Sequence, residues 1–170
     1  MSEVSTSSDE VREWDALARA ASDRGDSSES LDEVQQLLCF ELAEAPYAVP
    51  VERVREIVRM GPVTPIPRTP EDVRGVISLR GEMIELIDVR RRLGLGAIEP
   101  SRRTRIIVTK TSDDEVVGLL VDAVREVLRV SAEAIQPATG SDAGAVNDLC
   151  TFRDEFVSMI ELDRLLTLDA

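Results

Sequence analysis

The chain has 170 residues, a formal net charge of −13 and no histidine. Its length suits one compact domain with a short extension, and its acidic charge disfavours nucleic acid as a partner. Without histidine, a histidine general base and the Ser-His and Cys-His nucleophile pairs are excluded, so we expect a protein that is not an enzyme and that uses no cofactor or metal.

The first 33 residues are rich in serine, aspartate and glutamate, with ten acids against three arginines, which predicts an acidic disordered tail at 1–33. The tail lacks the basic and apolar regions of a secretory signal, and the chain has no apolar run long enough for a membrane span. We therefore expect a cytoplasmic protein without direct membrane insertion. The apolar residues of the tail recur at helical spacing: Val11, Trp14, Leu17, Ala18 and Ala21. Two interpretations stay open, a short docking helix that carries the only tryptophan and a transient helix.

Beyond residue 33, short apolar runs alternate with turns, as is typical of β-proteins with few helices. The expected strands lie at 37–42, 47–49, 76–79, 83–87, 105–109, 116–121, 149–152 and 156–160. Four prolines within 60–70 predict an edge or irregular segment. Asp88 is expected to cap a short helix that Gly94 ends. Cys39 and Cys150 lie inside apolar runs, which predicts buried, unreactive thiols.

The chain contains an internal repeat. Val51–Arg59 resembles Val121–Arg129 at an offset of 70 residues, and Leu79–Leu93 resembles Phe152–Leu166 at an offset of 73. A repeat of half a chain indicates two similar subdomains, and each half is long enough for a small closed β-barrel.

The repeat therefore predicts an all-β domain with a few short helices over 34–170. We expect its two β-barrel subdomains at roughly 34–100 and 101–170, with some strands crossing between them.

Each repeat carries an acid and an arginine at matching positions, Glu56 with Arg80 and Glu126 with Arg153. Such residues either grip the backbone of a partner or form exposed ion pairs that contribute little to stability. The basic run Arg90–Arg92 is interpreted as a solvated face or a contact for an acidic partner.

Two further features have open interpretations. Gly118 lies inside an apolar strand, where it marks either a bulge or the close approach of another backbone. Lys110 is the only lysine among 20 basic residues. This bias indicates either a saline cytoplasm, whose ions screen an acidic surface, or a GC-rich genome.

Residues 75–81 read Gly-Val-Ile-Ser-Leu-Arg-Gly, and the apolar strand that follows ends in Asp-Val-Arg at 88–90. Further stretches that match a known family are 47–57, 64–70, 117–124 and 156–166. Together these motifs closely resemble the CheW family of chemotaxis coupling proteins over about 34–170. Two departures from the family pattern, Ser78 for Asn and Glu85 for Pro, leave the expected fold unchanged and bear on receptor specificity.

The resemblance implies two SH3-like five-stranded β-barrels packed together. It also implies a scaffold that couples chemoreceptors to the histidine kinase CheA, with the receptor tips and the regulatory domain of the kinase as partners. The receptor-binding groove between the barrels is expected at Val54, Glu56, Ile57, Gly75, Arg80, Gly81, Gly118 and Val121. The alternative function is the same adaptor in a kinase array of another pathway, such as surface motility.

Overall fold

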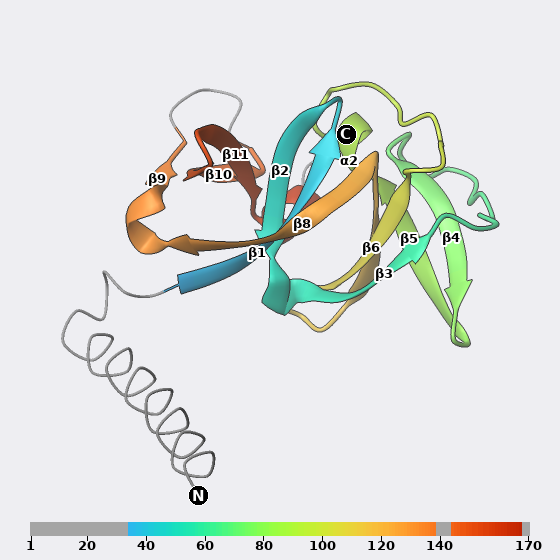
Figure 1. The fold of residues 1–170 in the computed structure, drawn as a ribbon. Helices are drawn as coiled ribbons and strands as arrows, with labels where there is room; N and C mark the ends of the chain where they lie inside the picture. The colour runs from blue at the N-terminus through green and yellow to red at the C-terminus, as the bar shows by residue number, and fades with distance from the viewer. Residues whose placement is uncertain (1–33, 139–143, 168–170) are drawn as a thin grey trace, which may run out of the picture.

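The computed structural model describes residues 34–138 and 144–167. Within these residues, eleven strands form two sheets and the helices are short (Figure 1), so the predicted all-β class is confirmed. None of the helices in these two ranges is long and apolar enough to cross a membrane.

Along the described chain, short helical segments interrupt a succession of strands. The strands are β1 (Val34–Leu42), β2 (Ala45–Pro50), β3 (Val54–Arg59), β4 (Val73–Leu79), β5 (Glu82–Asp88), β6 (Arg105–Lys110), β7 (Val116–Val121), β8 (Ala123–Ser131), β9 (Ile135–Pro137), β10 (Val146–Phe152) and β11 (Glu155–Ile160). The helical segments are η1 (Val51–Arg53), α2 (Val89–Arg92), η2 (Ala132–Ala134) and α3 (Leu162–Thr167).

The two sheets share one topology. One has the order β3-β6-β7-β5-β4, and the other has the order β8-β1-β2-β11-β10 with the short β9 added at its edge. In each, one neighbouring pair is parallel, β5 with β7 and β11 with β2. The two SH3-like subdomains implied by the family resemblance are therefore confirmed, and we call them the first subdomain (β3 to β7) and the second subdomain (β1, β2 and β8 to β11).

The sheets follow the expected division of the chain near residue 100 only in part, because strands cross between the subdomains as the expectation allowed. β6 and β7 lie in the first subdomain although they belong to the second half of the chain, and β1 and β2 lie in the second subdomain. The two sequence repeats have thus exchanged their first hairpins. The reason is strand pairing, because β8 pairs with β1 from Val34 to Glu41 and β6 pairs with β3.

The exchanged hairpin is stabilised by burial on both faces. Along β1, Leu37 and Cys39 pack into the core of the second subdomain. The alternate residues Leu38 and Phe40 pack into a larger core with residues of β5, β6 and β7. Successive strand residues point to opposite faces, so β1 lies between two cores, and this explains the apolar run from Leu37 to Phe40.

Two-residue turns close the hairpins of both subdomains. Arg80 and Gly81 connect β4 to β5 with φ values of 52° and 84°. Arg153 and Asp154 connect β10 to β11 with φ values of 50° and 63°. Positive φ at both central residues is the signature of a type I′ turn, whose twist matches that of paired strands.

Within the basic run on α2, Arg90 and Arg92 are partly or fully buried and structural, whereas the Arg91 side chain is 41% exposed, as expected of a solvated face. The three arginines pair with acids: Arg90 with Asp122, Arg91 with Glu71 and Arg92 with Asp72. The side chains of Arg92 and Asp72 are only 7% and 1% exposed and lie 2.5 Å apart. Arg92 also donates to the main-chain oxygens of Leu165 and Leu166 at the end of α3. The expected contact with an acidic partner is therefore wrong for Arg92, which fastens α3 to the first subdomain.

The predicted cap and the predicted thiols are both confirmed. Asp88 accepts a hydrogen bond from the Arg91 amide at 3.1 Å, and Gly94 follows α2 with a φ of 76°. Cys39 and Cys150 are both buried and unbonded. Burial raises the pKa of the Cys39 thiol to about 11, so the reactive thiolate is scarce at neutral pH.

Candidate functional site

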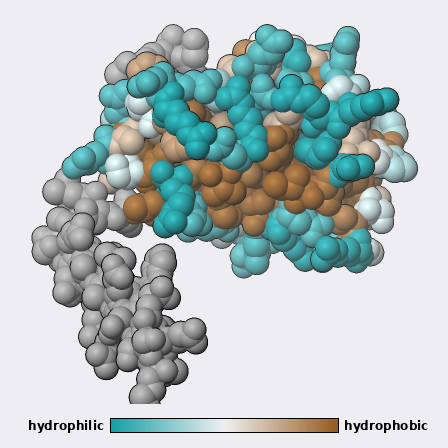
Figure 2. Space-filling model, viewed as in Figure 1, coloured by the Kyte–Doolittle hydropathy of each residue, from teal (hydrophilic) through white to brown (hydrophobic). Residues whose placement is uncertain are grey.

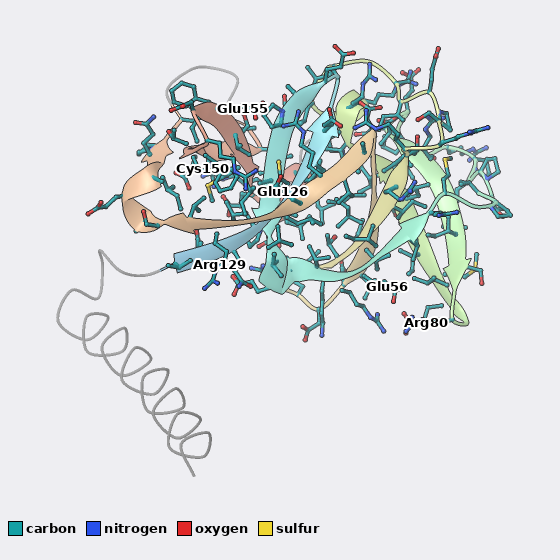
Figure 3. The ribbon with its side chains drawn as sticks, viewed as in Figure 1. Glu56, Arg80, Glu126, Arg129, Cys150 and Glu155 are labelled. Atoms are coloured by element: carbon teal, nitrogen blue, oxygen red, sulfur yellow. The ribbon has the colours of Figure 1, made fainter. Side chains whose placement is uncertain are left out.

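Glu56 and Arg80 join two elements that are distant in sequence. Arg80 Nη2, in the β4–β5 turn, lies 3.1 Å from Glu56 Oε2 on the edge strand β3 (Figure 3). The Glu56 side chain is 20% exposed and that of Arg80 is 78% exposed. A second ion pair, Arg55 with Glu82 at 3.4 Å, joins the same two elements. Two ion pairs therefore hold the turn against β3, while most of the Arg80 side chain stays free to contact a partner.

The second subdomain repeats this arrangement. Glu126 on β8 pairs with Arg153 in the β10–β11 turn at 3.7 Å, and Arg125 pairs with Glu155 at 3.3 Å. The Arg153 guanidinium also lies 4.8 Å from the centre of the Phe152 ring, within cation–π distance. The matching acids and arginines of the two sequence repeats thus form matching ion pairs.

A register shift brings apolar side chains of β3 and β8 to the surface. The shift follows Val54 in β3 and the equivalent Val124 in β8. A bulge inserts one unpaired residue, so residues three apart share a face instead of pointing to opposite ones. Val54 therefore lies on the same face as Ile57, and Val124 lies on the same face as Val127.

These four valine and isoleucine side chains form what we call the apolar strip. Ile57 is 42% exposed and Val127 is 51% exposed, whereas Val54 and Val124 are half-buried against the larger core. Figure 2 shows an apolar band across this face, between polar regions, in the part of the view where Figure 1 places β1, β8 and β3. Val54 and Val124, one from each subdomain, pack against the same larger core, which has residues of both subdomains.

The eight predicted groove residues divide into two groups. Val54, Glu56 and Ile57 on β3 lie with Arg80 and Gly81 of the adjoining turn. The other three are buried: Gly75, Gly118 and Val121. The structure therefore brings together five of the eight beside β3 and the β4–β5 turn of the first subdomain and leaves three buried in the interior.

The two interior glycines have packing roles. Gly75 has a φ of 139°, and a Cβ atom there would collide with the main-chain oxygen of Thr64. Gly118 pairs regularly with its neighbours, so of its two open interpretations the bulge is wrong. A methyl group added at Gly118 would lie only 3.0 Å from the Ile106 side chain. Both positions need glycine because another group lies close to the Cα atom. At Gly75 this group is the Thr64 backbone, and at Gly118 it is the Ile106 side chain.

Val124 and Val127 were not among the predicted groove residues. The signal that finds them is the repeat itself, since they occupy the positions of Val54 and Ile57 at the offset of 70 residues. The two departures from the family pattern, Ser78 and Glu85, are both exposed, so neither affects the core.

The chemistry of this surface is that of protein binding. Exposed apolar side chains at the centre and ion pairs at the border are typical of protein interfaces, where aromatic and aliphatic anchors are surrounded by a polar rim. The fold and the site therefore define a protein-binding module built from two β-barrels.

Residues 36–170 match the protein family described as CheW-like domain. The chain therefore belongs to the CheW-like domain family.

Individual relatives and a solved structure agree with this assignment. The chemotaxis protein CheW of Rhizobium meliloti (strain 1021) is 37% identical over 133 residues, which are 76% of this chain and 85% of that protein. Protein FrzA of Myxococcus xanthus is 33% identical over 137 residues, which are 78% of this chain and 85% of that protein. The crystal structure of the scaffolding protein TtCheW from Thermoanaerobacter tengcongensis is similar with a TM-score of 0.75 and 33% identity, and the match covers 81% of this chain and 95% of that one.

Proposed function

We propose that the chain is a non-enzymatic adaptor that couples chemoreceptors to the histidine kinase CheA in the cytoplasm. The observation that carries this proposal is the apolar strip, which has residues of both subdomains and is bordered by the Glu56–Arg80 ion pair. A scaffold needs a surface that binds other proteins without catalysing a reaction. Exposed aliphatic residues beside a partly exposed ion pair supply such a surface.

The receptor side of the adaptor is assigned to this strip. A receptor tip is a helical hairpin, and an amphipathic helix binds a groove through apolar residues that recur every three or four positions. Ile57 and Val127 offer exposed apolar contacts at the two ends of the strip, one from each subdomain. Arg80 retains donors beyond its bond to Glu56, and these suit the carbonyl or carboxylate oxygens of a helix end.

A second candidate function rests on the similarity to FrzA, a relative whose identity is close to that of the CheW proteins. In that case the same strip serves receptors and a kinase of a different signalling pathway. The adaptor chemistry is the same in both cases, so the identity of the bound partners separates them.

The test is recovery of partners from cytoplasm with the tagged full chain. The adaptor role predicts that a histidine kinase and coiled-coil receptors are recovered together, and that Ile57→Asp loses the receptors and keeps the kinase. Recovery of neither partner, or nucleotide turnover by the purified protein, contradicts the proposal. CheA with chemotaxis receptors supports the first candidate, and a different kinase supports the second.

A further inference from the structure

The described chain begins on an open face of the second subdomain. β1 starts at Val34, which is 48% exposed, and 33 residues precede it. A depression of about 480 Å³ adjoins this start. Its lining residues are Val34, Gln35, Gln36, Pro50, Val51 and Glu52.

Strand register connects this depression to the apolar strip. In the β1–β8 ladder, Gln36 lies opposite Arg129 and Leu38 lies opposite Val127. Residues directly opposite one another in an antiparallel pair share a face, and so do residues two apart along a strand. Val34 therefore lies on the same face as Val127. We call this surface the β1–β8 face, and it is continuous from the depression to one end of the strip.

The β1–β8 face carries a positive charge suited to an acidic ligand. Arg129 is exposed beside the first residues of β1 (Figure 3). Among residues 34–138 and 144–167, no carboxylate forms an ion pair with Arg129, unlike the arginines of the flanking hairpins.

The sequence before β1 has the complementary pattern. In residues 9–21, an apolar side chain recurs every three or four positions from Val11 through Trp14 to Ala21, which is the spacing of one helical face. Glu10, Glu13 and Asp15 lie beside this apolar set in the sequence. A helix of these 13 residues would be ~20 Å long, comparable with the ~14 Å from Val34 to Leu38 along β1.

The connection is long enough for docking within one molecule. Residues 22–33 would span ~40 Å when extended and ~19 Å as a flexible coil. A short flexible linker gives an effective concentration of about 1 mM. A contact with an intrinsic Kd of ~0.1 mM would then be about nine-tenths occupied, which lowers the apparent affinity of a competing ligand about tenfold.

We propose that residues 9–21 dock as a helix on the β1–β8 face of the same molecule, with their apolar side chains, Trp14 among them, along the face from Val34 to Val127. The docked helix covers the Val127 end of the apolar strip, so a partner that binds the strip must displace it. Docking itself needs no partner and holds whether or not the strip binds receptors.

Tryptophan fluorescence of the full chain tests this directly, because Trp14 is the only tryptophan. Docking predicts an emission maximum blue-shifted from that of free tryptophan amide and slower quenching by acrylamide. Val127→Asp should shift the emission to that of free tryptophan amide, because it adds an acid beneath an acidic segment. Arg129→Glu should do the same. Met83→Asp, which changes another exposed apolar residue, in β5 next to the β4–β5 turn, is the matched control and should leave the emission unchanged.

Three outcomes overturn the proposal. The first is emission of the unmodified chain equal to that of free tryptophan amide. The second is a blue shift that Val127→Asp and Arg129→Glu leave intact while circular dichroism shows both variants folded. The third is a blue shift that grows with protein concentration, because it identifies a second copy of the chain as the occupant of the face.

Discussion

Arg80 lies 3.1 Å from Glu56 across the gap between the β4–β5 turn and the edge strand β3. The sequence repeat left two interpretations of these residues open, contact with a partner's backbone or an ion pair, and the structure shows the ion pair. Because Arg80 is largely exposed, the pair by itself stabilises the fold by less than about 1 kcal/mol. Its position beside the apolar strip suits binding better than folding.

The first prediction concerns the two members of this pair. Arg80→Ala should weaken binding of a receptor tip about tenfold, or ~1.4 kcal/mol. The reason is that a bound partner would bury the Glu56 carboxylate without its ion-pair partner. Glu56→Ala should have a similar effect. The double variant should lose less than the sum of the two, since both changes break one interaction. Isothermal titration with a soluble receptor fragment measures all three.

Arg153→Ala is the matched control, because it breaks the equivalent ion pair of the second subdomain. It should leave receptor affinity unchanged. Strictly additive losses would show that Glu56 and Arg80 act separately, and unchanged affinity in Arg80→Ala would remove Arg80 from the site.

The turn conformation of Arg80 gives a second prediction. Its φ of 52° lies in the left-handed region, which costs most residues about 1–2 kcal/mol and which asparagine tolerates well. Arg80→Asn creates the favoured Asn-Gly turn, so it should raise the free energy of unfolding by up to ~1 kcal/mol while weakening receptor binding. Urea denaturation beside the titration checks this. A loss of stability together with binding would instead show that the ion pair supports the fold.

The third prediction separates packing from binding at Gly75. Gly75→Ala should destabilise the domain by about 2 kcal/mol, because its φ of 139° and the Thr64 oxygen leave no place for a Cβ atom. Gly61→Ala is the control, since no atom lies within 4 Å of its added methyl group. Thermal unfolding of both variants measures the difference. Equal stabilities would restore Gly75 as a candidate for direct contact.

Three strands were not predicted from the sequence: β3, β8 and the short β9. β3 and β8 contain most of the first pair of repeated blocks, 51–59 and 121–129. Beyond the bulge of β3, Glu56 and Val58 are half-buried on one face, while Ile57 and Arg59 are exposed on the other. Charged residues therefore occur on both faces, and the alternation of apolar and polar residues that marks a strand is lost. The bulge adds one residue to the period. The repeat identified these blocks as important, but single-strand patterns could not assign their conformation.

Local sequence patterns could not predict which hairpins are exchanged between the two subdomains. A linear repeat predicts two similar units, and it does not say whether β1 pairs with strands of its own half or with β8 of the other half. That choice depends on contacts far apart in sequence, such as Val34 with Ser131. By contrast, Asp88 as a cap and Gly94 as the end of its helix were predictable, because each depends on neighbours within a few residues.

The acidic surface gives a fourth prediction. If the lysine-poor composition reflects a saline cytoplasm, self-repulsion at a net charge of −13 should weaken as salt shortens the screening length from ~10 Å at 0.1 M to ~3 Å at 1 M. The melting temperature should then rise by more than about 2 °C over that range of KCl, which corresponds to ~1 kcal/mol. A flat melting temperature would favour the genome-composition interpretation.

The most direct test of the adaptor function is a ternary binding measurement with Ile57→Asp. This change places a charge in the apolar strip at a side chain that is 42% exposed, so the fold should persist. With the unmodified chain, size-exclusion chromatography should show receptor fragment and kinase regulatory domain eluting together with the protein. With Ile57→Asp, the kinase domain alone should co-elute. Co-elution of both partners with Ile57→Asp, or of neither with the unmodified chain, would contradict the proposed function.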